Sequence, residues 1–432
     1  MDQETIPIPS EVFCVFKTTM SAPYKLPETP ISVSIDFTEA TLSQLINQLL
    51  TDQNDPEDPI SLQFEFLIKD DFLRGNLKSH IMKHAISSET NLVIHYCLAL
   101  NKPKLAEKVQ MEDWISVISP INEIEGPLLV GSFTGGLRLY GPRAKELLGE
   151  GEIKGKSLNA MKVFPNFLKS EPDFSHVIYS GHSDESLRIS FFNSTEKNKV
   201  PHKKNPKLDI VTKVLCKGHN SSIEALDSHP LDNSWFASGA YDGELILWRL
   251  NNLETLHESE GIAIEGTRKK IKVSPIKELK PFNKNKLHHD KISEIIWQKP
   301  ESLITGSFDH SIKVFDIEKS QESASFLCRD TAVTGLGILG KTLISGHEDG
   351  YIKLWDFRDK TAKKLLKSHG IWISKVRPLE NNETIFASAG YDKNVKIWDI
   401  RSEFPLFSSK SHNDKVFCLE WNGKKMSFFY EI

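Results

Sequence analysis

The stretch that decides the fold is Gly218-His219 … Ser238-Gly239-Ala240-Tyr241-Asp242-Gly243 … Trp248, which recurs in degenerate form along most of the chain. Three further copies keep most of its polar residues: His288 … Thr305-Gly306-Ser307-Phe308-Asp309 … Phe315-Asp316, Ser345-Gly346-His347-Glu348-Asp349-Gly350 … Trp355-Asp356, and His369 … Ser388-Ala389-Gly390-Tyr391-Asp392 … Trp398-Asp399. The steps between Asp309, Asp349 and Asp392 are 40 and 43 residues (349 − 309 and 392 − 349).

This spacing is typical of WD repeats, which recur at about 40–45 residues and form one four-stranded propeller blade each. Two weaker copies precede the good ones, at Gly131-Ser132-Phe133-Thr134-Gly135 and at Ser180-Gly181-His182-Ser183-Asp184. A last copy starts at His412, with Val416 four residues on, as Ile223 follows His219. Seven starts predict an all-β, seven-bladed WD-repeat β-propeller.

The recurring Ser or Thr, His and Asp could be read as a catalytic triad, but we expect a structural network inside each blade. Trp248 can donate its indole N–H to Ser238, Ser238 can bond His219, and Asp242 can hold the imidazole. A hydrolase needs one such set, facing a pocket, and the chain has no G-x-S-x-G elbow. The predicted network residues are His219, Ser238, Asp242, Trp248, His288, Thr305, Asp309, Ser345, Asp349, Trp355, His369, Ser388, Asp392 and Trp398.

Composition favours an intracellular scaffold. The 54 basic and 58 acidic residues give a net charge of −4, which offers no whole-chain attraction for nucleic acid. The five cysteines are far apart and lack C-x-x-C spacing, so neither a disulfide framework nor a zinc site is predicted, and no cofactor is expected. The acidic N-terminus and the lack of long apolar runs predict neither secretion nor a membrane-spanning segment.

The first hundred residues lie outside the repeat and predict an α+β domain. Val12, Cys14 and Phe16 alternate as a strand, and so do Ile31 to Phe37, Leu62 to Ile68 and Leu92 to Tyr96. Between the second and third strands, Thr41 could cap a helix with an apolar stripe from Leu42 to Leu50. With a short helix near 76–84, this is the order of a ubiquitin-like β-grasp. We therefore expect a ubiquitin-like (NLE-type) domain at 1–100, a linker at 101–111 and the propeller at 112–432.

A ubiquitin-like domain joined to a seven-bladed WD propeller resembles the WD-repeat ribosome-biogenesis factors of the pescadillo–Bop (PeBoW) complex, the family of Ytm and the WD-repeat PeBoW subunits. The matching motifs are Phe64-Glu65-Phe66-Leu67-Ile68, Leu73-Arg74, Ile86-Ser87-Ser88-Glu89 … Leu92, Glu112-Asp113-Trp114-Ile115-Ser116-Val117-Ile118 and Ser411-His412-Asn413-Asp414-Lys415-Val416. The resemblance implies a non-enzymatic assembly factor in rRNA processing and large-subunit maturation. It implies action in the nucleus, nucleolus and nucleoplasm, with pescadillo and a Bop-family WD protein as partners on pre-ribosomal particles.

The same resemblance implies release by the AAA ATPase midasin through the ubiquitin-like domain. It assigns Glu89 as a carboxylate ligand to a Mg²⁺ held by midasin, whereas from the residues alone a loop glutamate is a solvated surface group. Two basic stretches, Pro201–Lys207 and Arg268-Lys269-Lys270-Ile271-Lys272, are either solvated loops or local contacts. For Arg268, Lys269, Lys270 and Lys272, nuclear localisation is the functional interpretation. Direct RNA contact is left open.

The spacing from Asp242 to Asp309 widens to 67 residues (309 − 242), which predicts a charged insertion at about 251–286, between blades three and four. The last repeat departs from the family pattern because Trp421 to Ile432 lacks a second Ser-Gly-Gly-x-Asp turn, so the seventh blade is expected to be short. Two alternative functions stay open: a Notchless-type pre-ribosome factor, and a WD-repeat adaptor of the ubiquitin pathway. An enzyme ranks last, since no nucleophile, phosphate loop or metal cluster stands out.

Overall fold

A computed structural model describes most of the chain. The described residues are 10–18, 20, 23–53, 62–68, 71–84, 86, 91–99, 109, 113–121, 126–141, 146–153, 157–166, 174–193, 207–250, 276–329, 331–379, 382–409, 412–422 and 425–430. The chain divides into two compact units: Met1–Lys104 together with Asp399–Phe407, and the rest of the chain from Leu105 onward.

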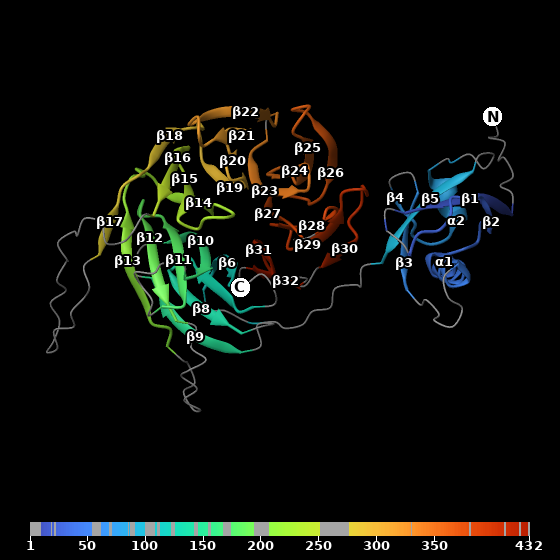
Figure 1. Ribbon diagram of the computed structural model, residues 1–432, viewed down its shortest axis with the longest axis horizontal. Coiled ribbons are helices and arrows are strands. Elements are labelled where there is room, and N and C mark those ends of the chain that lie inside the picture. The colour runs from blue at the N-terminus through green and yellow to red at the C-terminus, as the bar shows by residue number, and fades with distance from the viewer. Residues whose placement is uncertain are drawn as a thin grey trace. The chain divides into compact units, whose positions relative to one another are not determined.

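The N-terminal residues form one mixed sheet with two helices, drawn in blue in Figure 1. Its elements are β1 (Glu11–Lys17), β2 (Ile31–Ser34), α1 (Glu39–Gln53), β3 (Phe64–Ile68), β4 (Asp71–Phe72), α2 (Leu77–Lys83) and β5 (Leu92–Leu98). The sheet order is β2-β1-β5-β3-β4, with β1 parallel to β5 and the other pairs antiparallel. The predicted α+β order is therefore confirmed, with a short extra strand, β4, where a turn was expected.

The period-two alternation buries one face of this sheet under helix α1. Val12, Cys14 and Phe16 of β1 are buried, and every fourth residue of α1, from Leu42 through Ile46 to Leu50, lies in the same core. The helix begins at Glu39, earlier than predicted. Thr41 is not its cap: its hydroxyl accepts the Thr38 N–H at 2.7 Å and donates to the Thr38 carbonyl.

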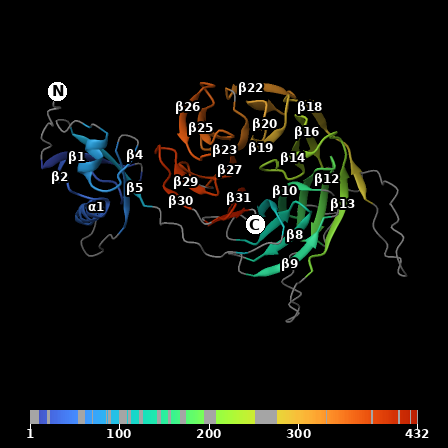
Figure 2. The same cartoon turned by 180° about the vertical axis from the view of Figure 1, so that it is seen from behind.

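The remaining strands make seven sheets arranged around a ring, antiparallel apart from one parallel edge strand, and Figures 1 and 2 show this ring from its two sides. Blade 1 is β6 (Ile115–Pro120), β7 (Leu128–Ser132), β8 (Gly136–Tyr140) and β9 (Leu147–Glu152); blade 2 is β10 (Leu158–Pro165), β11 (His176–His182), β12 (Leu187–Phe192) and β13 (Ile210–Cys216). Blade 3 is β14 (Ile223–Ser228), β15 (Trp235–Ala240), β16 (Glu244–Arg249) and β18 (Asn283–Lys286); blade 4 is β19 (Ile292–Lys299), β20 (Ser302–Ser307), β21 (Ser311–Asp316) and β22 (Gln321–Leu327). Blade 5 is β23 (Val333–Leu339), β24 (Thr342–His347), β25 (Tyr351–Asp356) and β26 (Ala362–Lys367); blade 6 is β27 (Ile373–Pro378), β28 (Ile385–Gly390), β29 (Val395–Asp399) and β30 (Phe407–Ser409). Blade 7 is β31 (Val416–Asn422) and β32 (Lys425–Tyr430). The predicted propeller is confirmed, and within the described residues its last blade has two strands.

The ring closes through its innermost strands. Each blade's first strand packs beside the next one, and β31 of blade 7 packs beside both β27 and β6. Arg377 on β27 spans this junction, with its guanidinium 3.1 Å from Glu294 on β19 and 3.0 Å from Glu420 on β31. Burial alone would raise the pKa of Glu294, but the charges of Arg377 and Lys375 hold it below its usual value. A buried carboxylate of blade 4 is thus kept ionised between two cations of blade 6, and Arg377 joins blades 4, 6 and 7.

The expected insertion is placed differently by the structure. It begins after β16 and ends with β18, so it lies inside blade 3 rather than between blades 3 and 4. The reason is that a WD repeat ends with the third strand of its blade, so a gap between repeats separates the third strand from the fourth. Two segments of the expected insertion are strands: β17 (Lys277–Leu279) pairs in parallel with the outer strand of blade 2, and β18 completes blade 3.

Blade 2 is tied to blade 1 in the same way as blade 3 is tied to blade 2. The segment before β13 bridges in parallel to β9 of blade 1, where the Leu208 N–H donates to the Glu150 carbonyl at 2.7 Å. A Cβ atom on Gly151 would come within 2.7 Å of both the Leu208 carbonyl and Ile210. The excursions between third and fourth strands therefore tie neighbouring blades along their outer edges.

The turn glycines give the first prediction. Gly350 has a φ of +80°, and a Cβ there would lie 2.3 Å from the carbonyl oxygen of His369. Both the left-handed backbone and the clash penalise any side chain, so Gly350→Ala should lower the free energy of unfolding by about 2 kcal/mol or more. Gly370→Ala, where a Cβ meets nothing within 4 Å, is the matched control and should stay within about 0.5 kcal/mol of wild type. Urea denaturation measures both free energies of unfolding, and an equal decrease for the two variants would contradict this account of the turn.

Candidate functional site

In blade 6 one buried hydroxyl joins two aromatic side chains. The Ser388 Oγ on β28 accepts the indole N–H of Trp398 at 2.9 Å and lies 2.8 Å from Nε2 of His369. In blade 4 threonine replaces the serine, and the Thr305 Oγ1 lies 2.7 Å from Nε2 of His288. The hydroxyl suits this place because it both donates and accepts.

The turn aspartates of blades 4 and 6 hold the other ring nitrogen. Asp309 lies 2.9 Å from Nδ1 of His288, and Asp392 lies 2.7 Å from Nδ1 of His369. Burial opposes ionisation of these carboxyls, but hydrogen bonds from the histidines and from the turn lower the pKa values of Asp309 and Asp392. Each carboxylate also accepts a backbone N–H two residues on, which fixes the turn.

Blade 3 makes the same serine contacts without the aspartate. Ser238 Oγ lies 2.6 Å from His219 Nε2 and accepts the Trp248 indole N–H at 2.7 Å. Asp242 instead accepts the backbone N–H of Glu244, and Nδ1 of His219 has no hydrogen-bond partner among the described residues. Burial is the largest cause that lowers the pKa of His219 to about 4, so the ring is neutral at pH 7.

In blade 5 the imidazole comes from a residue within strand β24, His347, which was not in the predicted set. His347, two residues after Ser345, places Nε2 2.7 Å from the Ser345 hydroxyl, which also accepts the Trp355 indole N–H at 2.7 Å. Among the described residues, Asp349 accepts the Tyr351 N–H and has no bond to a histidine. Burial lowers the pKa of His347 to about 3. This strand has the sequence Ser-Gly-His, as has Ser180-Gly181-His182 in blade 2. That shared pattern is the signal that could have identified His347.

These sets are inside the blades. Ser238, Ser345 and Ser388 are fully buried, and each of these three hydroxyls bonds one indole and one imidazole. A nucleophilic serine must instead face a substrate. The repeated Ser, His and Asp therefore have the geometry of a structural network.

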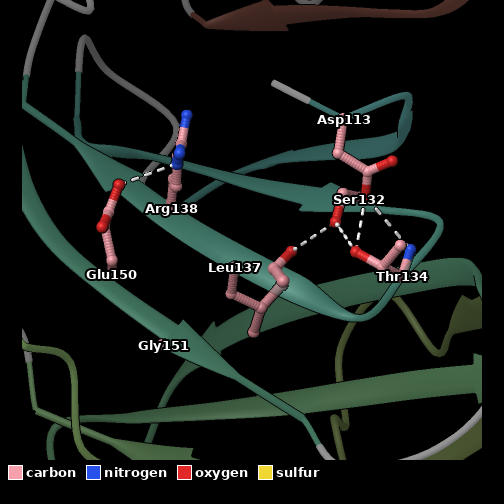
Figure 3. A pocket seen from close by; sticks show the side chains of 8 residues that line it. Asp113, Ser132, Thr134, Leu137, Arg138, Glu150 and Gly151 are labelled. Carbon is pink, nitrogen blue, oxygen red and sulfur yellow. Dashed lines mark hydrogen bonds and ion pairs between the residues drawn. The ribbon is translucent and has the colours of Figure 1, made fainter. Parts of the chain in front are cut away.

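Blade 1 departs from the pattern, and Figure 3 shows a cavity there. Asp113, from the segment before β6, accepts the Thr134 hydroxyl at 2.5 Å, and Thr134 contacts Ser132 at 3.0 Å. On the other wall, Arg138 pairs with Glu150 at 2.9 Å. The cavity, about 230 Å³, is below the roughly 300–1,000 Å³ of ordinary ligand sites, and its polar groups bond one another.

The other predicted site residues are not placed. Glu89 and the basic residues Arg268, Lys269, Lys270 and Lys272 lie outside the described residues. Within the described part of the chain, His, Cys, Asp and Glu side chains form no group of three or more that could hold a metal ion. The described helices include none that is long and apolar enough to span a membrane.

The two units define the class: a WD-repeat propeller protein with an N-terminal domain of the NLE type. The family model described as "NLE (NUC135) domain" matches residues 12–81, and the model "WD domain, G-beta repeat" matches residues 211–249, 323–356 and 360–399.

Similarity to individual proteins extends over nearly the whole chain. "Ribosome biogenesis protein WDR12 homolog" of Chlamydomonas reinhardtii is 27% identical, with 96% of this chain and 93% of that protein covered. Proteins of the same name from Nematostella vectensis (27% identity; 94% and 94% covered) and Ixodes scapularis (28%; 93% and 92%) are similar too. The resemblance to WD-repeat ribosome-biogenesis factors found in the sequence is thereby confirmed. A computationally designed protein, Ika8, is similar in fold alone, with a TM-score of 0.50, 18% identity, and 74% of this chain and 81% of that chain covered.

The shared hydroxyl gives a stability prediction with a matched control in the same blade. Ser388→Ala leaves the Trp398 indole and the His369 imidazole without their common partner, and each unpaired group costs about 1–3 kcal/mol. Ser374→Ala removes a buried hydroxyl that has no partner among the described residues, so it should be neutral or stabilising. Guanidinium unfolding of the two variants measures the difference; similar stabilities would show that the network contributes little.

The buried histidines predict a dependence on pH. Their folded pKa values are lowered, so above the ordinary value of 6.5 their contribution is fully present, and it is lost as the unfolded chain takes up protons at lower pH. Between pH 7 and pH 5, His219 and His347 should each lower the free energy of unfolding by about 2 kcal/mol. Replacing His347 by glutamine should remove its share of this pH dependence. An identical pH dependence in wild type and variant would mean that the pKa of His347 is the same in the folded and the unfolded chain, and would contradict this account.

Proposed function

We propose that this chain is a non-enzymatic assembly factor in ribosome biogenesis. One observation carries the proposal: an NLE-type domain and a WD propeller occur together, and the chain is similar along more than nine-tenths of its length to proteins named for ribosome biogenesis. A non-enzymatic role is supported by the burial of the Ser, His and Asp sets within blades, where they leave no nucleophile facing solvent.

Each domain has its own proposed task. The ubiquitin-like domain, assigned to residues 1–100, is the part that midasin engages, and residues 101–111 connect it to the propeller of residues 112–432. The propeller holds pescadillo and a Bop-family WD protein on precursors of the large ribosomal subunit. These partners follow from the family resemblance, as does a nuclear, nucleolar and nucleoplasmic location, to which Arg268, Lys269, Lys270 and Lys272 contribute.

Co-purification tests the function. An affinity-tagged full-length chain, isolated from nuclear extract, should bring pescadillo, a Bop-family protein and pre-ribosomal RNA in amounts comparable to the tagged chain. An empty tag and a tagged unrelated WD propeller are the controls. Recovery of ubiquitin ligase subunits without pre-ribosomal RNA would contradict the proposal and favour a ubiquitin-pathway adaptor.

Glu89 is proposed to complete the coordination of a Mg²⁺ held by midasin. A hard carboxylate oxygen is the ligand that Mg²⁺ prefers, so charge and reach both matter. Glu89→Gln keeps the shape but should weaken binding at least about tenfold, and Glu89→Asp, one methylene shorter, should fail as well.

The measurement is binding of the full chain to the midasin adhesion domain, with Mg²⁺ and with chelator. Wild type should lose binding with chelator, whereas Glu89→Ala should bind weakly in both conditions while still co-purifying with pescadillo. Equal binding by wild type and Glu89→Ala would overturn this role for Glu89 without touching the scaffold function.

A further inference from the structure

Two equivalent positions of each blade meet on one rim of the propeller. One is the residue just before the innermost strand, and the other is the residue before the turn aspartate. A backbone hydrogen bond joins them: Phe133 N–H to Trp114 O in blade 1, Tyr241 to Ser222 in blade 3, Phe308 to Lys291 in blade 4 and Tyr391 to Trp372 in blade 6. Side chains at these positions therefore project from the same rim.

Aromatic residues occupy both positions in blades 1 and 6 and one position in blades 3 and 4, and they contact one another across blades. Blades 2 and 5 have small or polar residues there: Ser157, Ser183, Ala332 and Glu348. Phe308 lies 6.0 Å from Trp372, Trp372 stacks on Tyr391 at 5.8 Å, and Tyr391 lies 5.5 Å from Phe417. Phe417 in turn lies 6.5 Å from Trp114 and 6.2 Å from Phe133. We name this set the aromatic arc: Phe308, Trp372, Tyr391, Phe417, Trp114 and Phe133, with Tyr241 joined to it through Lys291.

Three rings of the arc are exposed, and the other four, Phe133, Phe308, Tyr391 and Phe417, are half-buried. Trp114 is 51% exposed, Tyr241 56% and Trp372 38%. Scattered exposed apolar residues need no explanation, but a contiguous row of Trp, Tyr and Phe is the composition of a protein interface.

The rings already attract cations from the chain itself. The ammonium of Lys291 lies 5.9 Å from the Tyr241 ring and 5.5 Å from the Phe308 ring, and that of Lys415 lies 5.3 Å from the Tyr391 ring. Among the residues that the structure describes, no lysine or arginine lies over Trp114, Trp372 or Phe417. Cations bind the faces of such rings electrostatically.

Carboxylates follow the arc, each next in sequence to one of its residues or lysines: Asp113, Asp242, Asp290 and Asp414. Within the described residues none of the four is paired with lysine or arginine, whereas Lys291 is neutralised by Glu224 at 2.7 Å. Hydrogen bonds from Thr134 and Ser132 outweigh burial and lower the pKa of Asp113, so it stays ionised. Lys286, Lys393 and Lys415 also have no carboxylate partner among the described residues. The four aspartates still exceed these three lysines, and Asp309 and Asp392, which bond histidines, add two further carboxylates. The balance of charge beside the rings is therefore negative, which disfavours a polyanion such as RNA and favours a cation.

We propose that the aromatic arc binds an arginine-rich segment of a protein partner, whose guanidinium groups stack on Trp372, Phe417 and Trp114 and pair with the aspartates beside them. Arginine suits this surface better than lysine, because its planar group stacks on rings and bonds carboxylates at once. The inference concerns direct binding by the propeller, so it stands whether or not the proposed ribosomal role is correct.

The test uses the full chain and three probes: a fluorescein-labelled decapeptide of alternating arginine and leucine, the same peptide with glutamate for arginine, and a decamer of oligouridylate. Fluorescence anisotropy should show binding of the arginine peptide alone, weakening as salt rises. Trp372→Ala and the double variant Asp290→Asn/Asp414→Asn should each raise its Kd at least about tenfold.

Leu365→Ala is the matched control, because Leu365 on β26 is as exposed, at 59%, but lies away from the arc. It should bind like wild type, and equal melting temperatures for all variants would exclude unfolding as the cause. No binding of the arginine peptide, or the same loss with Leu365→Ala, would overturn the proposal. Tighter binding of oligouridylate, lost in Trp372→Ala, would overturn it in favour of a single-stranded RNA surface.

Discussion

A buried hydroxyl shared between an indole and an imidazole is the constraint on which blades 3, 5 and 6 depend, and blade 4 keeps the imidazole contact through Thr305. A four-stranded blade buries polar side chains in a low-dielectric interior, where an unpaired group is costly. Ser238, Ser345 and Ser388 satisfy both neighbours with one oxygen, and so the blade carries a fixed pattern of polar residues within an apolar sheet. The same need explains why the pattern recurs in sequence and why it is not a catalytic site.

Because the recurring Ser, His and Asp side chains bond one another inside the blades, we expect the function of the propeller to depend on its surfaces. The inner strands are held by ion pairs among themselves, with Arg377 joining Glu294 and Glu420 where the ring closes. What faces solvent is the rim with its exposed aromatic rings and uncompensated aspartates. A closed ring with such a rim, joined in one chain to a small NLE-type domain, has the construction expected of a protein that brings others together.

The fold was largely predictable because its signals are local. The spacing of turn aspartates gave the blades, and strand alternation gave the N-terminal sheet, since both depend on side chains near in sequence. The exceptions are of two kinds. Within blade 5, His347 replaces an upstream histidine, and the local Ser-Gly-His pattern is the signal that could have identified it. In blade 3, His219 Nδ1 has no hydrogen-bond partner among the described residues, an arrangement that the spacing of the motif does not predict. The parallel docking of β17 on β13 joins segments about 60 residues apart and has no pattern of its own. The aromatic arc shows the same limit: Trp114 and Phe417 are distant in sequence, and only ring closure brings them together.

The central claim, a non-enzymatic factor in ribosome biogenesis, is tested most directly by the balance of ribosomal subunits. Cells depleted of this chain should be analysed by sucrose-gradient sedimentation, with the ratio of free large to free small subunits as the readout. The account predicts that this ratio falls as the chain is lost, with accumulation of unprocessed precursor rRNA, and that re-expression of the intact chain restores it. An unchanged ratio after complete depletion would contradict the account.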